Sequence, residues 1–398
     1  MTISIHTKKA IDTTSPNYRS MADSLSALAS KDFTLWGKEA EAETSIRLGW
    51  IDLPYESEKL LPELKLVQEF ISHNQLSHFV LCGMGGSSLG PEVLSKTYKK
   101  QLTIVDTTDP DQILSSTPSN LAATAIIIGS KSGGTAETSS QKEYFVSALL
   151  SQGLDPARHL IIITDPGSPF DQECRAHGYF VINANPHVGG RFSVLSAFGL
   201  VPATAMGIDV ASFLKEAQSA SESFTKPGSP ALQLAAAILE SQNQIISMSD
   251  HGTSVPGLAD WIEQLIAEST GKNGVGFLPI ALPSTDSPAG GDGLRIAFKE
   301  DASADVVVQA SLAEHFILWE WATALLGIPM HINIFDQPNV QEAKTSAIAL
   351  LNEWNGSVPS SKPDATLAGP EKIYPKSFIT FLEKITATTQ LWPTLLVV

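Results

Sequence analysis

The chain has 398 residues, of which 43% are hydrophobic and 17% charged, and its formal net charge is −16 at pH 7. This length is sufficient for two or three domains with buried cores, and the composition is that of an ordinary globular protein. The acidic balance argues against a nucleic-acid or anionic-membrane partner, because both require a basic face on the protein. It does not exclude a small phosphate ligand, for which one local basic cluster is enough.

The cysteines and the N-terminus argue against a disulfide-rich, zinc-binding, exported or membrane-spanning protein. The two cysteines, Cys82 and Cys174, provide neither a disulfide framework nor the spacing of zinc ligands. The N-terminus has no apolar signal segment, and no apolar run reaches transmembrane length. We therefore expect a cytoplasmic protein.

The first 75 residues differ from the rest in the spacing of their apolar residues. Residues 1–20 are polar and irregular, and we expect a loose arm there. Apolar side chains then recur at helical spacing, which predicts helices over residues 21–75. These positions include Leu25, Leu28, Leu60, Leu61, Leu64, Val67 and Phe70.

Two series of short apolar runs follow, separated by gaps that can hold helices. The first series is His78–Cys82, Leu102–Asp106, Ala125–Gly129, Leu160–Thr164 and Tyr179–Asn183. The second follows a Pro/Gly break at 226–230 and is Ile245–Ser249, Gly276–Ile280, Leu294–Phe298, Asp305–Ala310 and His331–Phe335. Helices fit at 230–242, 257–270, 311–327 and 338–354, and Pro283–Gly293 is predicted to be a long loop.

This alternation of strands and helices predicts an α/β fold made of two similar units in tandem. Each unit is expected to be a parallel sheet flanked by helices. We place an N-terminal arm and helix at 1–45, a first domain at 46–225, and a second domain with a C-terminal helical tail at 226–398.

The most informative segment is Ser130–Thr138, which reads Ser-Lys-Ser-Gly-Gly-Thr-Ala-Glu-Thr. It follows an apolar run and opens a helix near Thr135. Free backbone N–H groups, the positive helix end and short hydroxyl donors therefore converge on one point, which suits a phosphate monoester. It is not a P-loop, because no Gly-Lys-[Ser/Thr] closes that pattern. The alternative is a capped helix with a glycine turn.

A second glycine-rich segment, Gly83–Pro91, ends the first strand of the first unit. Its glycines allow the backbone to approach a ligand at the carboxyl end of the strand. A dinucleotide-binding fold is an alternative, because Asp106 ends the next strand about twenty residues on. Ser88 occupies the third glycine position of that fingerprint, and the loop at Ser130 fits a monophosphate better than a pyrophosphate.

Three further segments contain candidate site residues. In Val188–Ser193 two glycines precede Arg191, which suits a small oxyanion; the alternative is a surface turn. Glu268 lies in the last turn of a predicted helix, against the negative end of the dipole, and is either a general base or a solvated residue. Gln337 follows the last predicted strand, and Lys344 lies on the next helix, where a surface lysine is the alternative.

Together these segments resemble the phosphoglucose isomerase family, which is built from two sugar-isomerase (SIS) domains, in order from about residue 45 to 355. Gly83–Pro91 resembles the family's G-I-G-G-S-x-L-G-P, and Ser130–Thr138 resembles S-K-T-F-T-T-x-E-T. Val188–Leu200 is similar to V-G-G-R-Y-S-x-x-S-A-x-G-L. Glu268–Lys272 is similar to E-S-N-G-K, and Phe335–Gln337 with Lys344 matches F-D-Q and the lysine seven residues later.

The resemblance implies an isomerase that exchanges glucose 6-phosphate and fructose 6-phosphate through a cis-enediolate, without a metal or redox cofactor. It implies Glu268 as the general base, Arg191 as the cation facing the enediolate, and Lys344 at the C1–C2 end of the sugar. The implied substrate-binding residues are Ser130, Lys131 (through backbone and charge), Ser132 and Thr135 for the phosphate, and Gly86, Ser87, Gly190 and Gln337 for the sugar. Family members usually form dimers, so a homodimer with sites near the interface is implied.

The sequence departs from the family pattern at one functional residue, and two alternative functions remain. The family's ring-opening histidine, in a G-x-x-G-Q-H stretch, has no counterpart between Lys272 and Glu314. His251, His315 and His331 are the candidates for that step, although a lone histidine is more often structural. The alternatives to a glucose-6-phosphate isomerase are a dual phosphoglucose/phosphomannose isomerase and a SIS-type sugar-phosphate sensor without catalysis.

Overall fold

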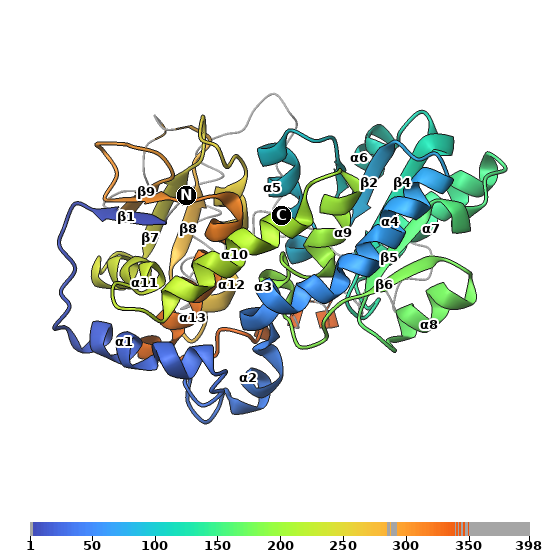
Figure 1. Ribbon diagram of the computed structural model, residues 1–398. Coiled ribbons are helices and arrows are strands. Elements are labelled where there is room, and N and C mark those ends of the chain that lie inside the picture. Colours follow the sequence, from blue (N-terminus) through green and yellow to red (C-terminus); the bar gives the residue numbers. More distant parts are fainter. Residues whose placement is uncertain are drawn as a thin grey trace, which may run out of the picture. The chain divides into compact units, whose positions relative to one another are not determined.

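The structure is a computed structural model that describes residues 3–284, 287, 293–338, 340, 342–343, 345–346 and 349. Its contacts divide the chain into two compact units, Met1–Gly271 with Gly276–Asp336, and Lys272–Val275 with Gln337–Val398. All the helices and strands described below, which Figure 1 labels where there is room, belong to the first unit. None of the helices in the described part of the chain combines the length and apolar character needed to cross a bilayer.

The first sheet has five parallel strands in the order β3-β2-β4-β5-β6. Their bounds are β2 (His78–Cys82), β3 (Thr103–Val105), β4 (Thr124–Gly129), β5 (Leu160–Thr164) and β6 (Phe180–Asn183). In the register of the central strands, Ile127 of β4 pairs with Leu81 on one side and with Ile161 on the other. Every residue of β4 and β5 is buried, as expected for strands covered on both faces.

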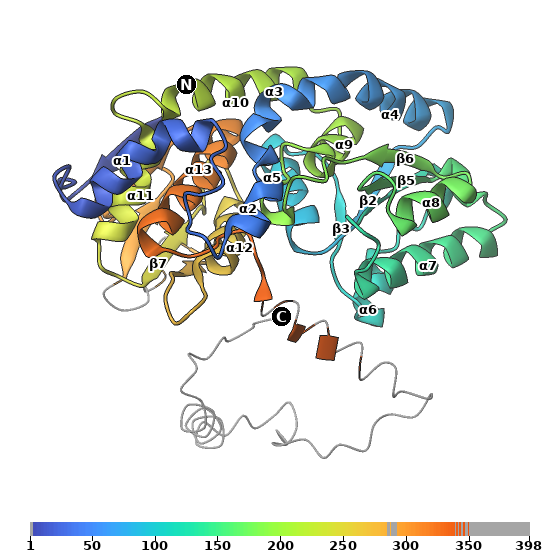
Figure 2. The same cartoon turned by 90° about the horizontal axis from the view of Figure 1, so that it is seen from below.

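Helices cover both faces of this sheet. They are α4 (Leu61–His73), α5 (Leu89–Tyr98), α6 (Pro110–Ser116), α7 (Ala136–Ser151), α8 (Pro169–Ala176) and α9 (Ala197–Ala205). Ile127 packs in the hydrophobic cluster that contains α4 and α9, whereas its neighbours Ile126 and Ile128 pack with α7 and α8. Figure 2 shows these two helix pairs on opposite sides of the sheet. The period of two along β4 thus divides the core into two layers.

The second sheet has the order β1-β10-β9-β7-β8. Its strands are β1 (Ser4–Thr7), β7 (Ile245–Ser249), β8 (Leu278–Ala281), β9 (Leu294–Ala297) and β10 (Val306–Gln309). Strands β7 to β10 are parallel, whereas β1 runs antiparallel along β10. The helices of this part are α10 (Val210–Phe224), α11 (Pro230–Glu240), α12 (Leu258–Thr270) and α13 (Leu312–Met330).

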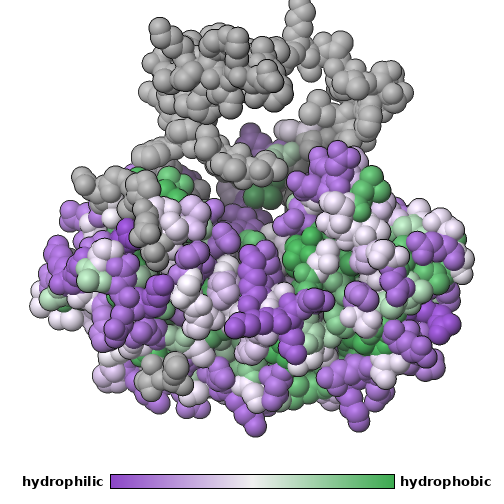
Figure 3. All heavy atoms as spheres, turned by 90° about the horizontal axis from the view of Figure 1, so that it is seen from above, coloured by the Kyte–Doolittle hydropathy of each residue, from purple (hydrophilic) through white to green (hydrophobic). Residues whose placement is uncertain are grey.

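Helix α13 is buried from Leu312 to Ile328 and forms the centre of this part of the core. It contacts α10, α11, α12 and the N-terminal helix α1 (Pro16–Ala29). Helices α2 (Glu41–Arg47) and α3 (Leu53–Glu56) complete the N-terminal segment. Hydrophilic side chains predominate on the face shown in Figure 3, with hydrophobic side chains between them.

The predicted α/β architecture with parallel, helix-flanked sheets is confirmed. All five strands of the first series form, as do four of the second, although β8 begins at Leu278 rather than Gly276. The proposed domain boundaries at 45/46 and 225/226 stay predictions. The predicted helix at 338–354 and the predicted loop Pro283–Gly293 lie largely outside the described residues.

Two sequence predictions are wrong. The expected loose arm at residues 1–20 instead contains β1, which pairs with β10, and the start of α1 at Pro16. The strand expected at His331–Phe335 does not form. His331 ends α13 in the left-handed conformation, with φ 52°, and the Asn333 side chain accepts a hydrogen bond from the Phe335 N–H. Ile332, Ile334 and Phe335 are buried, but in a turn rather than in a sheet.

Candidate functional site

The loop at residues 130–135, which the sequence predicts to bind phosphate and which we call the phosphate loop, connects β4 to α7. The Ser130 N–H donates to the Ile163 carbonyl at 3.0 Å, and the Asp165 N–H donates to the Lys131 carbonyl at 2.9 Å. The pairing of β4 with β5 therefore continues into the loop. Gly133 has a φ of 74°, and a Cβ at this position would lie 2.5 Å from the Cβ of Phe170. A residue other than glycine would be strained there, so this path of the loop requires glycine.

Hydroxyl groups are left unpaired where α7 begins. The Ser130 Oγ is buried and has no hydrogen-bond partner among the described residues. Thr135 is the N-cap of α7, with extended dihedrals, yet its side chain makes no capping hydrogen bond. The first N–H groups of a helix also have no intrahelical acceptor. Because a buried, unpaired polar group costs about 1–3 kcal/mol, an acceptor bound here restores lost interactions. A phosphate monoester fits this donor set.

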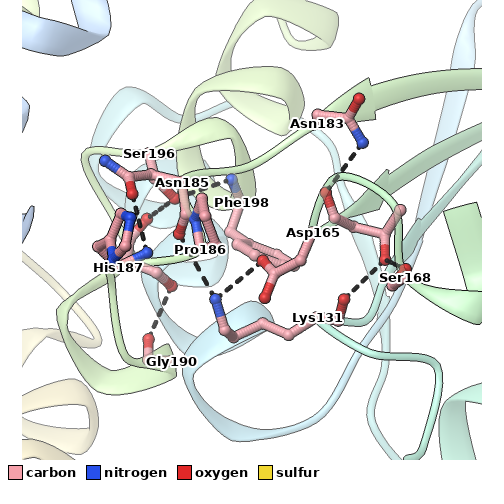
Figure 4. Close-up of polar contacts among 12 residues, drawn as sticks. Lys131, Asp165, Ser168, Asn183, Asn185, Pro186, His187, Gly190, Ser196 and Phe198 are labelled. Atoms are coloured by element: carbon pink, nitrogen blue, oxygen red, sulfur yellow. Dashed lines mark hydrogen bonds and ion pairs between the residues drawn. The ribbon is translucent and has the colours of Figure 1, made fainter. Parts of the chain in front are cut away.

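The other two predicted phosphate-binding residues already have partners. The Ser132 Oγ accepts a hydrogen bond from the Gly134 N–H at 3.2 Å. The Lys131 ammonium lies 2.9 Å from Asp165 Oδ1, and Figure 4 marks this ion pair with a dashed line. Burial lowers the pKa of Lys131, and the neighbouring Asp165 carboxylate opposes that shift. Lys131 thus contributes its backbone to the loop, while its charge faces Asp165.

The glycine-rich loop after β2 lies between the phosphate loop and the loop that contains Arg191. A Cβ on Gly86 would overlap the carbonyl of Gly190, so the two backbones touch at this point. The Ser87 Cβ lies 3.4 Å from the position of a Cβ on Gly129, the last residue of β4. The Ser87 hydroxyl accepts from the Met84 N–H at 3.0 Å and donates to the Met84 carbonyl at 2.9 Å. Gly86, Ser87 and Gly190 therefore line one continuous backbone surface.

Arg191 and Glu268 form the charged pair of the site. Arg191 Nη1 donates to Glu268 Oε2 at 2.9 Å, and the other oxygen of Glu268 accepts from Gln264 Nε2 at 2.8 Å. Arg191 also donates through Nε to Ser269 Oγ at 3.1 Å and through Nη2 to the Ile334 carbonyl at 2.7 Å. Its side chain is 3% exposed, whereas that of Glu268 is 29% exposed.

The electrostatics of this pair follow from its burial. Burial lowers the pKa of Arg191, and the adjacent Glu268 carboxylate, with a smaller contribution from Asp336, counteracts that shift. The guanidinium is thus held by three partners, while the Glu268 side chain stays partly exposed. A partly exposed carboxylate can accept a carbon-bound proton. A fixed cation beside it can stabilise the oxyanion that results.

The predicted site residues divide into four groups. Those of the phosphate loop lie together between β4 and α7: Ser130, Lys131, Ser132 and Thr135. Gly86, Ser87, Gly190, Arg191 and Glu268 come together directly, and Ser87 connects them to the phosphate loop. Gln337 is half-buried and belongs to the second unit. Lys344 lies outside the described residues.

Sequence reasoning missed residues that support this pair. Ser269 and Gln264 both bind it, and the signal for Gln264 was its position one helical turn before Glu268. Asp165, the partner of Lys131, had no signal, because it lies on a different strand end. Among the described residues, no group of three or more His, Cys, Asp or Glu side chains is arranged to hold a metal ion.

The three histidine candidates for ring opening differ in burial. His315 is 1% exposed and packs edge-to-face against Phe298. Burial lowers its pKa to about 3, so it is neutral at physiological pH and cannot donate a proton to a substrate. His251 and His331 are exposed. The structure therefore argues against His315 and leaves the other two.

The chain matches the family model for phosphoglucose isomerase over residues 69–273. It is 32% identical over 215 residues to a glucose-6-phosphate isomerase from Trichormus variabilis, covering 50% of this chain and 41% of that protein. It is also 32% identical over 242 residues to a glucose-6-phosphate isomerase from Thermus thermophilus, covering 58% and 57%. The chain thus spans about half the length of the curated relatives it matches.

Solved structures show the same fold. A hypothetical protein from Thermus thermophilus has a TM-score of 0.69 at 24% identity, covering 86% of this chain and 99% of that one. A glucose-6-phosphate isomerase from Chlamydia trachomatis has a TM-score of 0.66 at 17% identity, covering 93% and 87%. The family model covers just over half of the sequence, and on that basis the chain belongs to the phosphoglucose isomerase family.

Proposed function

We propose that this protein is a glucose-6-phosphate isomerase that interconverts glucose 6-phosphate and fructose 6-phosphate. The observation that carries the proposal is the Arg191–Glu268 pair, joined at 2.9 Å beside the glycine loops. It lies in the same unit as a helix start with an unpaired, buried Ser130 hydroxyl. Relatives named glucose-6-phosphate isomerase support the same assignment.

In the proposed reaction the protein binds the substrate through its phosphate, and the chemistry takes place at C1 and C2 of the carbon chain. Ser130, Ser132 and Thr135 bind the phosphate at the start of α7, so that binding energy remote from C1 and C2 orients the sugar. The backbone surface at Gly86, with Ser87 and Gly190, lies along the sugar. We assign Gln337 and Lys344 to the C1–C2 end on the basis of family membership.

Glu268 then transfers the proton between the two carbons. It removes the C2 proton of the open-chain aldose, the C2–H electron pair forms the C1–C2 double bond, and negative charge develops on O1. Arg191 faces that charge without having to reorient, because Ser269 and the Ile334 carbonyl already hold it. The carboxylic acid returns its proton to C1 while the O2 hydroxyl loses its proton to O1, which gives the ketose.

A coupled assay with glucose 6-phosphate, fructose 6-phosphate and mannose 6-phosphate tests this function. We expect interconversion of the first two and poor turnover of the third. Equal kcat/KM for glucose 6-phosphate and mannose 6-phosphate would indicate the dual isomerase instead. Binding of fructose 6-phosphate without turnover would indicate a sugar-phosphate sensor.

Family membership also leads us to propose a homodimer with sites near its interface, acting in the cytoplasm. Light scattering on the purified protein tests the dimer, and a mass of one chain at assay concentration would contradict it. Imaging of the tagged protein in cells tests the compartment.

A further inference from the structure

Thr164 and Asp165, at the end of β5, bind both the backbone carbonyl and the side-chain ammonium of Lys131. The Lys131 carbonyl accepts from the Asp165 N–H at 2.9 Å and from Thr164 Oγ1 at 2.7 Å. The Lys131 ammonium lies 2.9 Å from Asp165 Oδ1. Thr164 itself is fully buried. The last residue of β5 and the residue after it therefore fix the backbone and the side chain of Lys131 at the same time.

The Lys131 side chain also reaches a third loop. Its ammonium lies 3.5 Å from the Asn185 carbonyl, in the segment that follows β6 and leads to Gly190 and Arg191. Figure 4 shows Lys131 extended between Asp165 and Asn185. The side chain thus connects the phosphate loop, the end of β5 and the loop of the catalytic arginine.

The Lys131 ammonium lies in partly buried surroundings, where an ion pair with a carboxylate is favoured over an unpaired charge. The Lys131 side chain is 26% exposed and that of Asp165 is 21% exposed. Burial lowers the pKa of Lys131, as does the nearby Arg47 guanidinium, while Asp165 counteracts both. Without Asp165 a largely buried cation would lose its partner, which is strongly unfavourable.

We propose that Asp165 is a positioning residue for the phosphate loop. It keeps the Lys131 ammonium away from the ligand and holds the loop so that the Ser130 hydroxyl and the start of α7 face the phosphate. This inference rests on the proposed function, because it takes the loop to be the phosphate site. In the opposing arrangement the ammonium leaves Asp165 and contacts the phosphate directly.

The two arrangements predict opposite effects of Asp165→Asn. If Asp165 positions the loop, its removal weakens phosphate binding. If Asp165 competes with phosphate for the ammonium, its removal leaves binding unchanged or tightens it. Lys131→Met weakens phosphate binding in both cases, so the sign of the Asp165 effect decides between them.

We would measure the dissociation constant of inorganic phosphate by calorimetry, and KM and kcat for fructose 6-phosphate. The proteins are wild type, Asp165→Asn, Lys131→Met and the double variant. We expect each single variant to raise both the dissociation constant and KM about tenfold, the loss of one hydrogen bond to a charged group. The double variant should be no worse than either, because the two residues act as one unit. The value of kcat should change far less than KM, since ground-state binding is what is lost.

A matched control removes a comparable ion pair away from the loop. Lys96 and Glu92 on α5 are joined at 2.8 Å, and Glu92→Gln should leave phosphate binding near the wild-type value. If Asp165→Asn does not fold, Asp165→Glu replaces it, because it keeps the charge but displaces it by one methylene. The positioning role predicts weaker phosphate binding for this variant, and wild-type or tighter binding would overturn the inference.

Failure of the proposed function gives a different result. Wild-type protein that binds phosphate but does not turn over sugar phosphates would overturn the isomerase, while the order of the variants' phosphate affinities would still decide the role of Asp165. No phosphate binding by the wild type would overturn both. Tighter binding by Asp165→Asn in an active enzyme would overturn only the positioning role.

Discussion

Glu268→Gln is the sharpest test of the proposed site, because it removes the proposed base and leaves the geometry nearly intact. Both oxygens of Glu268 are hydrogen-bonded, one to Arg191 at 2.9 Å and the other to Gln264 at 2.8 Å. A glutamine at this position can still accept from Arg191, and its amide N–H can donate to Gln264 once the Gln264 amide flips. Arg191 keeps its bonds to Ser269 and to the Ile334 carbonyl. We therefore expect the variant to fold and to bind sugar phosphate.

We expect Glu268→Gln to lower kcat rather than substrate affinity. General-base catalysis is worth about 10²–10⁴-fold, and an amide cannot take up the C2 proton. We expect kcat to drop by about that factor with KM little changed, and hydrogen exchange at C2 in deuterated water to stop. NMR of fructose 6-phosphate in deuterated buffer measures the exchange, and a coupled assay measures turnover.

Gln264→Met is the matched control for this experiment. It removes one hydrogen bond to the carboxylate but leaves the carboxylate in place as a base, so we expect kcat to fall far less than in Glu268→Gln. Retention of more than about a tenth of wild-type turnover by Glu268→Gln, far above the range for a lost base, would refute the assignment and place the base elsewhere.

The remaining predictions concern binding, specificity and pH. Ser130→Ala with Thr135→Ala removes two donors to a dianion, each worth about 1.5–3 kcal/mol, so KM for fructose 6-phosphate should rise strongly and competitive inhibition by phosphate should vanish; unchanged inhibition would exclude this loop. Gln337→Thr should improve the turnover of mannose 6-phosphate, measured as kcat/KM, and a wild-type enzyme that is equally good with both aldoses would contradict the reasoning. Burial lowers the pKa of His315 to about 3, so the unfolded chain binds more protons and stability should fall as pH drops from about 6.5 towards 3. His315→Leu should flatten this part of the melting-temperature profile. Burial raises the pKa of Glu320 well above its usual range, so the stability it contributes is complete below about pH 4.3 and falls as pH rises. Glu320→Gln should remove that decline, and parallel profiles of variant and wild type would contradict it.

The fold was predictable where side-chain pattern and backbone pairing agree. Runs such as Ala125–Ile128 are apolar on consecutive residues, which requires a strand covered on both faces, and the structure buries them in two separate layers. Strand β1 was not predictable in this way. Ser4–Thr7 is short and largely polar, and it becomes a strand because the edge of β10 offers it hydrogen bonds. That pairing partner lies about 300 residues away, so no local pattern could indicate it.

Site residues expected to contact the ligand could be predicted from the sequence. Residues that only hold another site residue in place were harder to predict. The resemblance pointed to Arg191 and Glu268, which the structure joins directly. It gave no indication that the Lys131 charge would be paired with Asp165, because ion pairs between strand ends depend on the order of strands in the sheet. The charge of a loop lysine is therefore a weak guide to what the loop binds.

The wrong prediction at His331–Phe335 and the geometry of the Arg191–Glu268 pair both depend on where the backbone hydrogen bonds of this segment go. The run was predicted to be a strand because Ile332, Ile334 and Phe335 are apolar, and the structure does bury them. Burial of side chains does not determine where the backbone hydrogen bonds go. Here the Ile334 carbonyl accepts from Arg191, and the Asn333 side chain accepts from the Phe335 N–H. No strand neighbour pairs with this segment among the described residues, and the Ile334 carbonyl supplies one of the three contacts that hold Arg191. The turn that forms in place of the strand is thus part of what holds the Arg191 guanidinium beside Glu268.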